Sequence, residues 1–214
     1  NGRIDSNFNG IASNASGEWY CEYGQVQFAA SGLVKSENDA FDGWYYVRNG
    51  CVQKGQETVV QNSSGWWYIG TDGKVDFHKN TVAPNEYGWW AVRNGAVDFQ
   101  LNGIASNESG DWYCRGGQVD FGAAGVLESE TEGFSGWYYI QNGCVQKGQE
   151  TVKQNSNGWW YIGTDGKVDF GFSGIASNEN GTWYIENGKV NFTYSGTYED
   201  ENGRIYDIKS GNVA

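Results

Sequence analysis

Aromatic and aliphatic residues alternate with polar ones along this chain, in short runs that return roughly every 22 to 26 residues. One run reads Trp-Ala-Val-Arg at 90–93, followed by Asn-Gly and then Ala-Val-Asp-Phe at 96–99. Asn-Gly between two such runs is a strong signal for a two-residue turn in which both residues have positive φ. The pattern predicts a β-hairpin that pairs Trp90 with Phe99 and puts both side chains on one face.

The pattern occurs eight times along the chain, and the second half of the chain repeats the first. Trp112 stands 93 positions after Trp19, and the sequence around each reads alike. One Trp or Tyr occupies the equivalent hub position of each unit: Trp19, Tyr45, Trp67, Trp90, Trp112, Tyr138, Trp160 and Trp183. A unit this short buries nothing alone and must stack on its neighbours.

We therefore predict an all-β solenoid of about nine stacked β-hairpins, arranged as two duplicated blocks. The first four-hairpin block is residues 1–101, which start inside a truncated repeat, and the second is residues 102–194. Residues 195–214 form a capping hairpin with its turn at Lys209-Ser210-Gly211-Asn212. The opening residues resemble the second half of a repeat, so we expect the chain to derive from a longer array.

Three features of the units complete the predicted fold. Polar stretches such as 102–110 are expected to be connecting turns, each anchored by one buried isoleucine. Leu occurs only three times whereas aromatic residues make up 16%, which predicts an aromatic core. After Val52 and Val145 the motif QKGQETV replaces the expected Phe, as a variant packing unit or as a functional insertion. The predicted anchors are Ile11, Ile104 and Ile175.

Composition narrows the function classes. The formal net charge of −12 argues against nucleic acid, which requires clustered Lys and Arg, and suits neutral glycans and cationic groups. No apolar run has the length of a membrane span.

The four cysteines lie at equivalent places in the two blocks. Duplication favours pairing Cys21 with Cys51 and Cys114 with Cys144, which would indicate an extracellular setting. A zinc site is the rival interpretation, but the spacing lacks CxxC and paired histidines.

The stretch Trp-Trp-Tyr-Ile-Gly-Thr-Asp-Gly-Lys-Val at 66–75, repeated at 159–168, resembles the cell-wall-binding repeat of choline-binding and glucan-binding proteins of Gram-positive bacteria. The resemblance implies a superhelix of stacked hairpins that attaches secreted proteins to a surface. In the choline-binding branch it implies aromatic cages between adjacent hairpins. The Gly-Trp that follows the family's repeat is absent after Val75, which favours the glucan-binding or general wall-binding branch.

Adjacent aromatic residues are the candidate ligand contacts. Successive strand residues point to opposite faces, so Trp67, Trp90 and Trp160 are expected in the core and their preceding tryptophans in the grooves between units. Exposed aromatic rings hold sugars or cations, although packing between hairpins is the alternative role. The candidate ligand-binding residues are Trp44, Trp66, Trp89, Trp137, Trp159, Tyr68 and Tyr161.

The other polar groups predict no catalysis, no cofactor and no metal. An aspartate recurs at one strand position of the VDF motif, where we expect turn hydrogen bonds rather than a tuned carboxylate pair. The acidic stretches 36–43 and 128–136 are expected to be solvated loops, with weak calcium binding as the alternative. The single histidine, His78, has Gly171 as its counterpart in the second block, so no catalytic triad is supported. The recurring aspartates are Asp76, Asp98, Asp120 and Asp169.

The sequence thus predicts a non-catalytic module of a secreted or bacterial cell-surface protein. It would bind cell-wall polysaccharide or another glycan through aromatic grooves between hairpins, without nucleic acid and without membrane insertion. Two alternatives remain open: an adhesin or toxin segment that binds a host protein such as an immunoglobulin or mucin, and a structural stalk or filament subunit.

Overall fold

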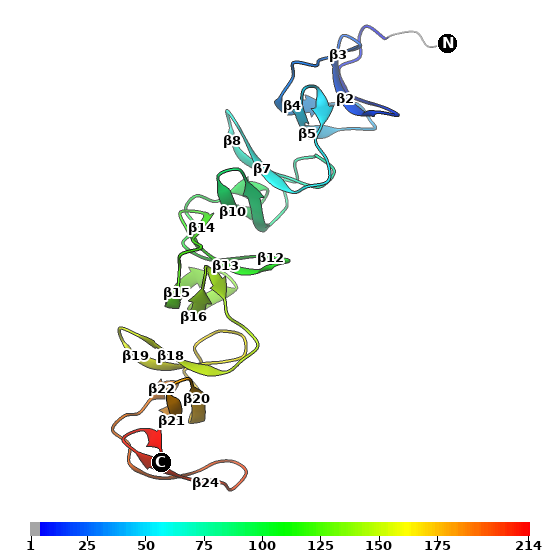
Figure 1. The fold of residues 1–214 in the computed structure, drawn as a ribbon. Coiled ribbons are helices and arrows are strands. Elements are labelled where there is room, and N and C mark those ends of the chain that lie inside the picture. The colour runs from blue at the N-terminus through cyan, green and yellow to red at the C-terminus, as the bar shows by residue number, and fades with distance from the viewer. Residues whose placement is uncertain (1–4) are drawn as a thin grey trace. The chain divides into compact units, whose positions relative to one another are not determined.

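The computed structural model describes residues 5–214, which contain β-strands and no helix. The all-β class and the repeated hairpins are confirmed (Figure 1). The part of the expected truncated repeat that falls on residues 1–4 lies outside the described residues. The chain divides into two compact units, one of residues 1–101 with 116–119 and one of residues 102–115 with 120–214.

The first unit contains two sheets. One has the order β1-β2-β6-β5-β4, with β3 paired to β2, and the other runs β7-β8-β11-β10-β14, with β9 paired to β10. The strands are β1 (Gly10–Asn14), β2 (Gly17–Glu22), β3 (Gln25–Val26), β4 (Gly32–Ser36), β5 (Gly43–Arg48), β6 (Cys51–Val52), β7 (Thr58–Asn62), β8 (Gly65–Ile69), β9 (Thr81–Asn85), β10 (Gly88–Arg93), β11 (Ala96–Val97) and β14 (Gln118–Val119).

The second unit repeats this arrangement. Its strands follow the orders β12-β13-β17-β16-β15 and β18-β19-β22-β21-β25-β24-β23, with β20 paired to β21. They are β12 (Gly103–Asn107), β13 (Gly110–Arg115), β15 (Gly125–Thr131), β16 (Phe134–Gln141), β17 (Cys144–Val145), β18 (Thr151–Asn155), β19 (Gly158–Ile162), β20 (Gly174–Asn178), β21 (Gly181–Glu186), β22 (Lys189–Val190), β23 (Gly196–Glu199), β24 (Ile205–Lys209) and β25 (Asn212–Val213).

The predicted Asn-Gly turns are confirmed. Asn94 and Gly95 have φ values of 48° and 74°, and Arg93 pairs with Ala96 across the turn. The predicted turn of the C-terminal hairpin also forms, with Ser210 at φ 50° and Gly211 at φ 77°. Asparagine and glycine tolerate this left-handed region, which most side chains avoid.

The strand pairing differs from the prediction in two places. The strand after each Asn-Gly turn is shorter than predicted, and an additional strand precedes each hub strand. The strand after Asn94-Gly95 ends at Val97, so Trp90 does not pair with Phe99 and instead has Ala83 and Gln118 as its Cα partners. The polar stretch expected to be a connecting turn is β12, which pairs with β13 along its whole length. β12 reads Gly-Ile-Ala-Ser-Asn, and Ile104 is its only residue of high β propensity, so its local sequence gives little sign of a strand.

Neighbouring hairpins are joined by one recurring backbone hydrogen bond. The amide that follows the hub aromatic donates to the carbonyl of the next hairpin's turn glycine, at 2.7 to 2.8 Å in every case. All eight turn glycines are buried. A Cβ added at Gly50 would lie 2.6 Å from the Gln27 carbonyl oxygen, so this approach requires glycine. The pairs are Tyr20 with Gly50, Tyr46 with Gly73, Tyr68 with Gly95, Ala91 with Gly117, Tyr113 with Gly143, Tyr139 with Gly166, Tyr161 with Gly188 and Tyr184 with Gly211.

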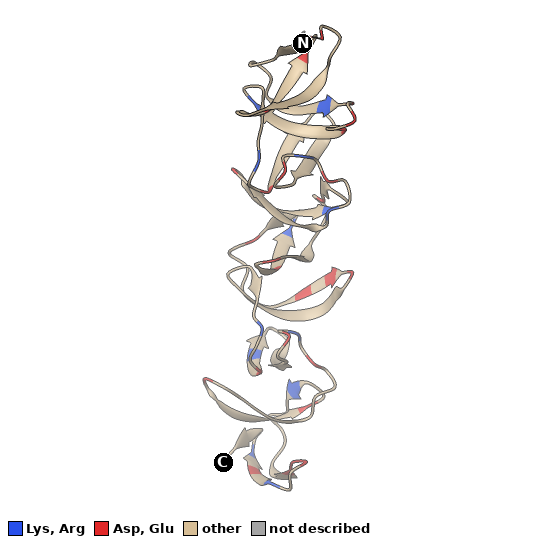
Figure 2. Cartoon of the chain, turned by 90° about the vertical axis from the view of Figure 1, so that its right-hand side faces the viewer, with Lys and Arg blue, Asp and Glu red and all other residues tan. Residues whose placement is uncertain are grey.

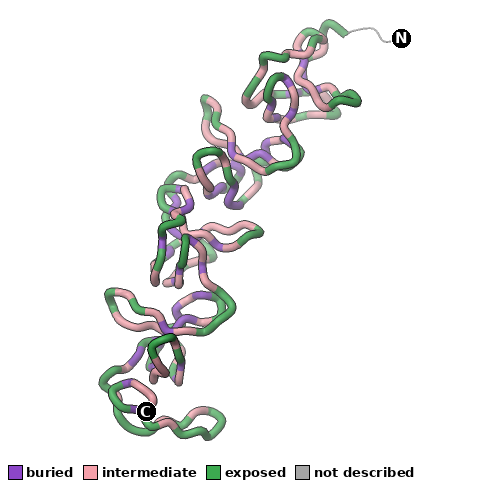
Figure 3. Tube along the Cα trace, viewed as in Figure 1, coloured by how far each residue is buried: buried purple, intermediate pink, exposed green. Residues whose placement is uncertain are grey.

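The core combines isoleucines and valines with a few buried tyrosines, which corrects the prediction that it is aromatic rather than aliphatic. The largest fully buried side chains are isoleucines and valines, and most stand two residues after a hub or in the first strand of a hairpin. Figure 3 shows that buried positions alternate with half-buried and exposed ones along the described chain. Hub tryptophans remain half-buried because their indole N–H groups need polar partners. The predicted anchors Ile11 and Ile104 are buried, whereas Ile175 is half-buried and its neighbour Ala176 is buried instead.

Charged groups serve the turns and the surface. Each recurring aspartate of the VDF motif accepts a hydrogen bond from the backbone amide two residues later, as predicted. Basic and acidic positions are interspersed along the chain (Figure 2). Across residues 5–214 no three His, Cys, Asp or Glu side chains group as metal ligands. The described part of the chain also has no helix long and apolar enough to cross a membrane.

The four cysteines are free thiols, so the predicted disulfides are not formed. The strand register explains this result. Cys51 lies opposite Trp19, whereas Cys21, two residues further along β2, lies opposite Val26 of its own hairpin. The same register puts Cys144 opposite Trp112 rather than Cys114.

Thiol reactivity tests this arrangement. Burial raises the pKa of the Cys114 thiol to about 12, so almost none of it is thiolate at pH 8. We expect a disulfide reagent at pH 8 to modify half-buried Cys51 at least about tenfold faster than Cys114, and urea to abolish the difference. Peptide mapping by mass spectrometry identifies the sites. A recovered Cys21–Cys51 disulfide, or equal modification of Cys114, would contradict the structure.

Candidate functional site

Every hub tryptophan is held by an asparagine five residues before it. The indole N–H donates to the asparagine Oδ1 at 2.9 to 3.2 Å. In all six turns the same oxygen also accepts a hydrogen bond from the backbone amide two residues after the asparagine, which closes the turn between the two long strands. One side chain therefore shapes the turn and orients the indole. The pairs are Asn14–Trp19, Asn62–Trp67, Asn85–Trp90, Asn107–Trp112, Asn155–Trp160 and Asn178–Trp183.

The sequence analysis missed these asparagines, although their signal was present. The spacing Asn-x-x-Gly-x-Trp recurs before each hub tryptophan and is absent before the two hub tyrosines. Tyr45 and Tyr138 are instead buried.

The first aromatic cluster consists of Trp66 on β8, Trp90 on β10 and Phe99. The Trp66 and Trp90 ring centroids lie 5.2 Å apart, and Phe99 lies edge-on at 5.8 Å from Trp66 and 5.6 Å from Trp90. Tyr87 adds a further edge at 6.1 Å from Trp66. Phe99 is 47% exposed and Tyr87 is 66% exposed, so solvent reaches the cluster.

The second aromatic cluster repeats this geometry in the other unit with Trp159, Trp183 and Phe192. The two indole centroids are again 5.2 Å apart, and Phe192 lies 5.9 Å from Trp159 and 5.6 Å from Trp183. Asn180 occupies the position of Tyr87. In both clusters the tryptophan that precedes one hub contacts the hub of the next hairpin. Trp66 thus packs on Trp90, and Trp159 packs on Trp183.

A third arrangement of the same residue types leaves a cavity. Trp137, Trp160 and Phe170 line a space of about 250 Å³ together with Val126, Val168 and Lys189. We call it the lysine pocket, because the Lys189 Nζ lies over the Trp160 ring, 5.0 Å from its centroid. Lys189 is the residue directly opposite Trp160 in the neighbouring strand β22.

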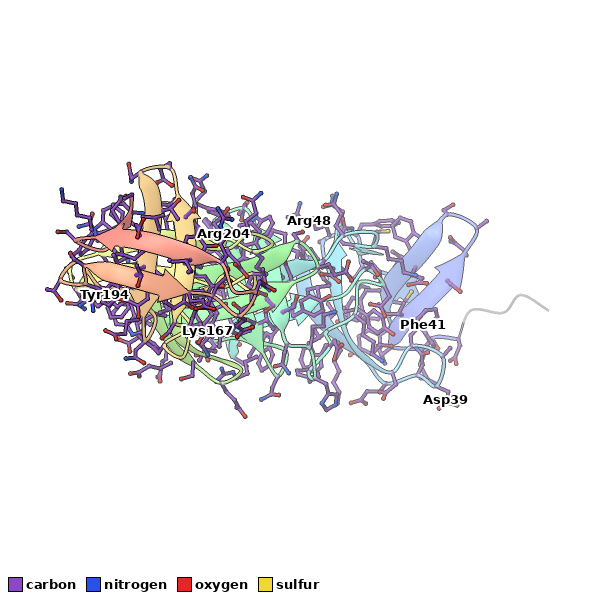
Figure 4. All side chains as sticks on the ribbon, turned by 90° about the horizontal axis from the view of Figure 1, so that it is seen from below. Asp39, Phe41, Arg48, Lys167, Tyr194 and Arg204 are labelled. Atoms are coloured by element: carbon purple, nitrogen blue, oxygen red, sulfur yellow. The ribbon has the colours of Figure 1, made fainter. Side chains whose placement is uncertain are left out.

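The residue opposite each hub determines what covers its ring. Lys74 and Lys167 stand opposite Tyr45 and Tyr138 (Lys167 is labelled in Figure 4), with their Nζ atoms 5.9 and 5.6 Å from the ring centroids. The other hubs face short or uncharged residues. The uncharged pairs are Trp19–Cys51, Trp67–Ala96, Trp90–Gln118, Trp112–Cys144 and Trp183–Asn212.

A polar groove of about 670 Å³ lies in the first unit, and Trp66 and Tyr87 of the first aromatic cluster line part of it. Tyr46 and Arg48 line it, with the Arg48 guanidinium 5.5 Å from the Tyr46 ring centroid (Figure 4). Gln53, Gln56 and Gln61 supply amide groups. The equivalent groove of the second unit is smaller, about 480 Å³.

The QKGQETV motif supplies a lysine to an ion pair and glutamines to the lining of a groove. Lys54 forms an ion pair with Glu18, and Lys147 forms the equivalent pair with Asp111. These acids stand where other units carry Trp66 or Trp159, so the lysines neutralise carboxylates that replace a tryptophan. The motif's glutamines also line the polar grooves.

The other predicted ligand residues differ in accessibility. Trp44, Trp89 and Trp137 are half-buried. Tyr68 and Tyr161 are buried in core clusters, at 2% and 5% exposure. Burial and a hydrogen bond to Glu150 raise the pKa of Tyr161 to about 12, so its hydroxyl stays protonated.

Comparison with known proteins identifies a family. The family model described as a choline-binding repeat matches residues 7–27, 31–53, 57–76, 79–98, 102–120, 135–146 and 171–191, more than half of the chain. No curated protein matches along its sequence.

Solved structures resemble the chain at low identity. CbpJ from Streptococcus pneumoniae TIGR4 is 18% identical, with 92% of this chain and 70% of that chain covered and a TM-score of 0.37. Choline binding protein F from Streptococcus pneumoniae is 14% identical, with 97% and 87% covered and a TM-score of 0.31. An alternansucrase in complex with isomaltononaose is 15% identical over 97% of this chain and 17% of its own, with a TM-score of 0.37.

The asparagine–indole bond yields a stability prediction. Asn85→Ala removes the acceptor of both the Trp90 indole and the Tyr87 amide, each at 2.9 Å, and should lower the free energy of unfolding by about 1–2 kcal/mol. Urea denaturation followed by tryptophan fluorescence measures the change. Glu86→Ala, in the same turn but exposed, is the control. Equal stability of the two variants would show that this bond does not hold the indole.

Proposed function

Because this chain belongs to the choline-binding repeat family, we propose that it is a non-catalytic module that binds choline groups of a bacterial cell-wall polymer in its aromatic clusters. Repeats of this family form choline-binding modules of the cell wall, and choline-binding proteins are associated with the surface of Gram-positive bacteria. The observation that carries the proposal is the pair of matching three-ring clusters, one in each unit.

The rings suit a quaternary ammonium for an electrostatic reason. The face of an aromatic ring carries partial negative charge, and a cation held by several rings gains about 0.5–2 kcal/mol from each close contact, depending on its desolvation. A quaternary ammonium donates no hydrogen bond, so it loses little when it leaves water for an apolar corner. The net charge of −12 adds a long-range attraction for cations.

Phe99 and Phe192 supply the third wall in these clusters. The Gly-Trp that is absent after Val75 is therefore not required to bring three aromatic rings together here. This geometry supports choline rather than the general wall-binding branch that the absence had favoured.

We assign the ligand contacts to the rings that meet between hairpins. Trp66 and Trp159 carry the two clusters, and Trp44 stands in the equivalent position before Trp67 and Phe77, whose centroids are 5.3 Å apart. Tyr68 and Tyr161 act in packing, because their rings are buried.

The polar groove favours a second candidate function, glycan binding. Its amide side chains and Tyr46 provide the hydrogen-bonding groups and the flat ring that a sugar requires. Because Trp66 and Tyr87 line both this groove and the first aromatic cluster, a glycan bound there would lie beside a choline in that cluster.

Binding to cell walls with and without choline tests both candidates. We expect the chain to bind immobilised choline and choline-bearing walls. The Trp66→Ala, Trp159→Ala double variant should bind at least about tenfold more weakly, because one contact is lost in each unit and avidity falls with it. Circular dichroism and thermal unfolding establish that the variant is folded.

Trp19→Ala is the matched control. Trp19 is a hub with the same asparagine bond, but Phe28 is its ring partner and Glu18 precedes it, so binding should persist. Unchanged choline binding by the folded double variant would contradict the cluster assignment. Retention on walls stripped of choline would favour the glycan candidate, and binding only to host serum proteins or mucin would contradict both.

A further inference from the structure

The lysine pocket has the ring types of the two aromatic clusters but differs from them in one charge. Its walls are Trp137, which precedes the hub Tyr138, together with the hub Trp160 and Phe170. Trp160 and Phe170 meet edge-on at 5.5 Å, close to the 5.6 Å of the equivalent pair Trp90 and Phe99. The difference is Lys189, which lines the pocket and stands over the Trp160 ring.

We propose that Lys189 occupies the cation position of this pocket and so excludes a quaternary ammonium from it. The inference rests on the proposed function, since it determines which of the aromatic sites take choline. The Lys189 Nζ lies 5.0 Å from the Trp160 ring centroid, within the range of a cation–π contact.

Glu186 stands opposite Lys189 in the same hairpin, but its carboxylate accepts a hydrogen bond from Asn191 Nδ2 at 2.8 Å and forms no ion pair with this ammonium. Lys189 makes no ion pair with any described residue, in contrast to Lys54, Lys147 and Lys153, which pair with carboxylates. A second cation placed in the same pocket would meet the Lys189 ammonium, which no ion pair engages, a few ångströms away. At such a separation two like charges repel with an energy comparable to a cation–π contact, which cancels the contribution of the rings.

The tethered ammonium also has an entropic advantage over a free ligand. Lys189 reaches Trp160 from the adjacent strand, where the two residues face each other, so it loses no translational freedom on binding the ring. Its methylene stem passes Gly158, where an added Cβ would collide with Lys189 Cε. The glycine therefore provides the space that lets the lysine lie along the sheet and reach the indole.

The first block contains a natural counterpart without the charge. Trp44, Trp67 and Phe77 stand 93 positions before Trp137, Trp160 and Phe170, and Ala96 stands 93 before Lys189. Ala96 faces Trp67 as Lys189 faces Trp160. Gly65 matches Gly158, so a lysine introduced at position 96 has the same path to the ring.

The duplication supplies a reciprocal experiment. Choline is titrated into the chain while the indole N–H signals are followed by NMR, with the number of bound choline molecules measured by calorimetry. In the wild-type protein we expect the Trp67, Trp90 and Trp183 signals to shift and the Trp160 signal to stay unchanged. Lys189→Ala should add one bound choline and make the Trp160 signal respond, whereas Ala96→Lys should remove one and silence the Trp67 signal.

Lys209→Ala controls for net charge, because it removes the same positive charge from an exposed position of the C-terminal hairpin. It should change neither the number of sites nor the Trp160 response. A Trp160 signal that shifts with choline in the wild-type protein, or a Lys189→Ala variant with no added site, would overturn the inference while leaving the proposed function intact. Absence of any choline response at Trp90 and Trp183 would overturn both.

Discussion

The hydrogen bond from the amide after each hub aromatic to the next hairpin's turn glycine is the constraint on which the rest of the structure depends. It recurs eight times at 2.7 to 2.8 Å and joins every described hub strand to the hairpin that follows. Short hairpins are marginal alone, so their stability comes from neighbours. The turn must be both left-handed and closely approached, which explains why all eight positions are glycine and why each is buried.

This spacing also creates the binding surfaces. When one hairpin docks through its turn glycine, the tryptophan before the preceding hub lies against the next hub, as Trp66 does on Trp90. Isoleucine, valine and a few tyrosines then fill the core, and the indoles lie between hairpins with their N–H groups bound to asparagine. The scaffold is constant, and two variable positions determine the chemistry of each seam: the residue before the hub, which is Trp, Thr or an acid, and the residue facing the hub, which is Lys or a short or uncharged side chain.

The sequence predicted the repeat, the hairpins and their turns because these depend on local signals such as Asn94-Gly95. The predictions were wrong where contacts between residues distant in sequence determine the structure. Phe99 contacts Trp90 as a ring but lies outside the strand, since pairing stops at Val97. The polar stretch at 103–107 forms a strand because its partner β13 satisfies its backbone, which no local propensity shows. The disulfides failed for the same reason, because register rather than spacing places Cys51 opposite Trp19.

The contact between Trp66 and Trp90 was only partly predictable from the sequence. Strand alternation placed Trp66 in a groove between hairpins, but the ring that it contacts depends on how the hairpins dock.

Replacing a turn glycine tests most directly how the hairpins dock. We compare Gly95→Ala with Gly55→Ala by urea unfolding. Both glycines have positive φ, but a Cβ at Gly95 would strike the Asp76 carbonyl, whereas none of the described atoms lies within 4 Å of one at Gly55. The account predicts a loss of about 1 kcal/mol for Gly55→Ala and at least about twice that for Gly95→Ala. Equal losses would mean that the turn glycine does not hold the hairpins together.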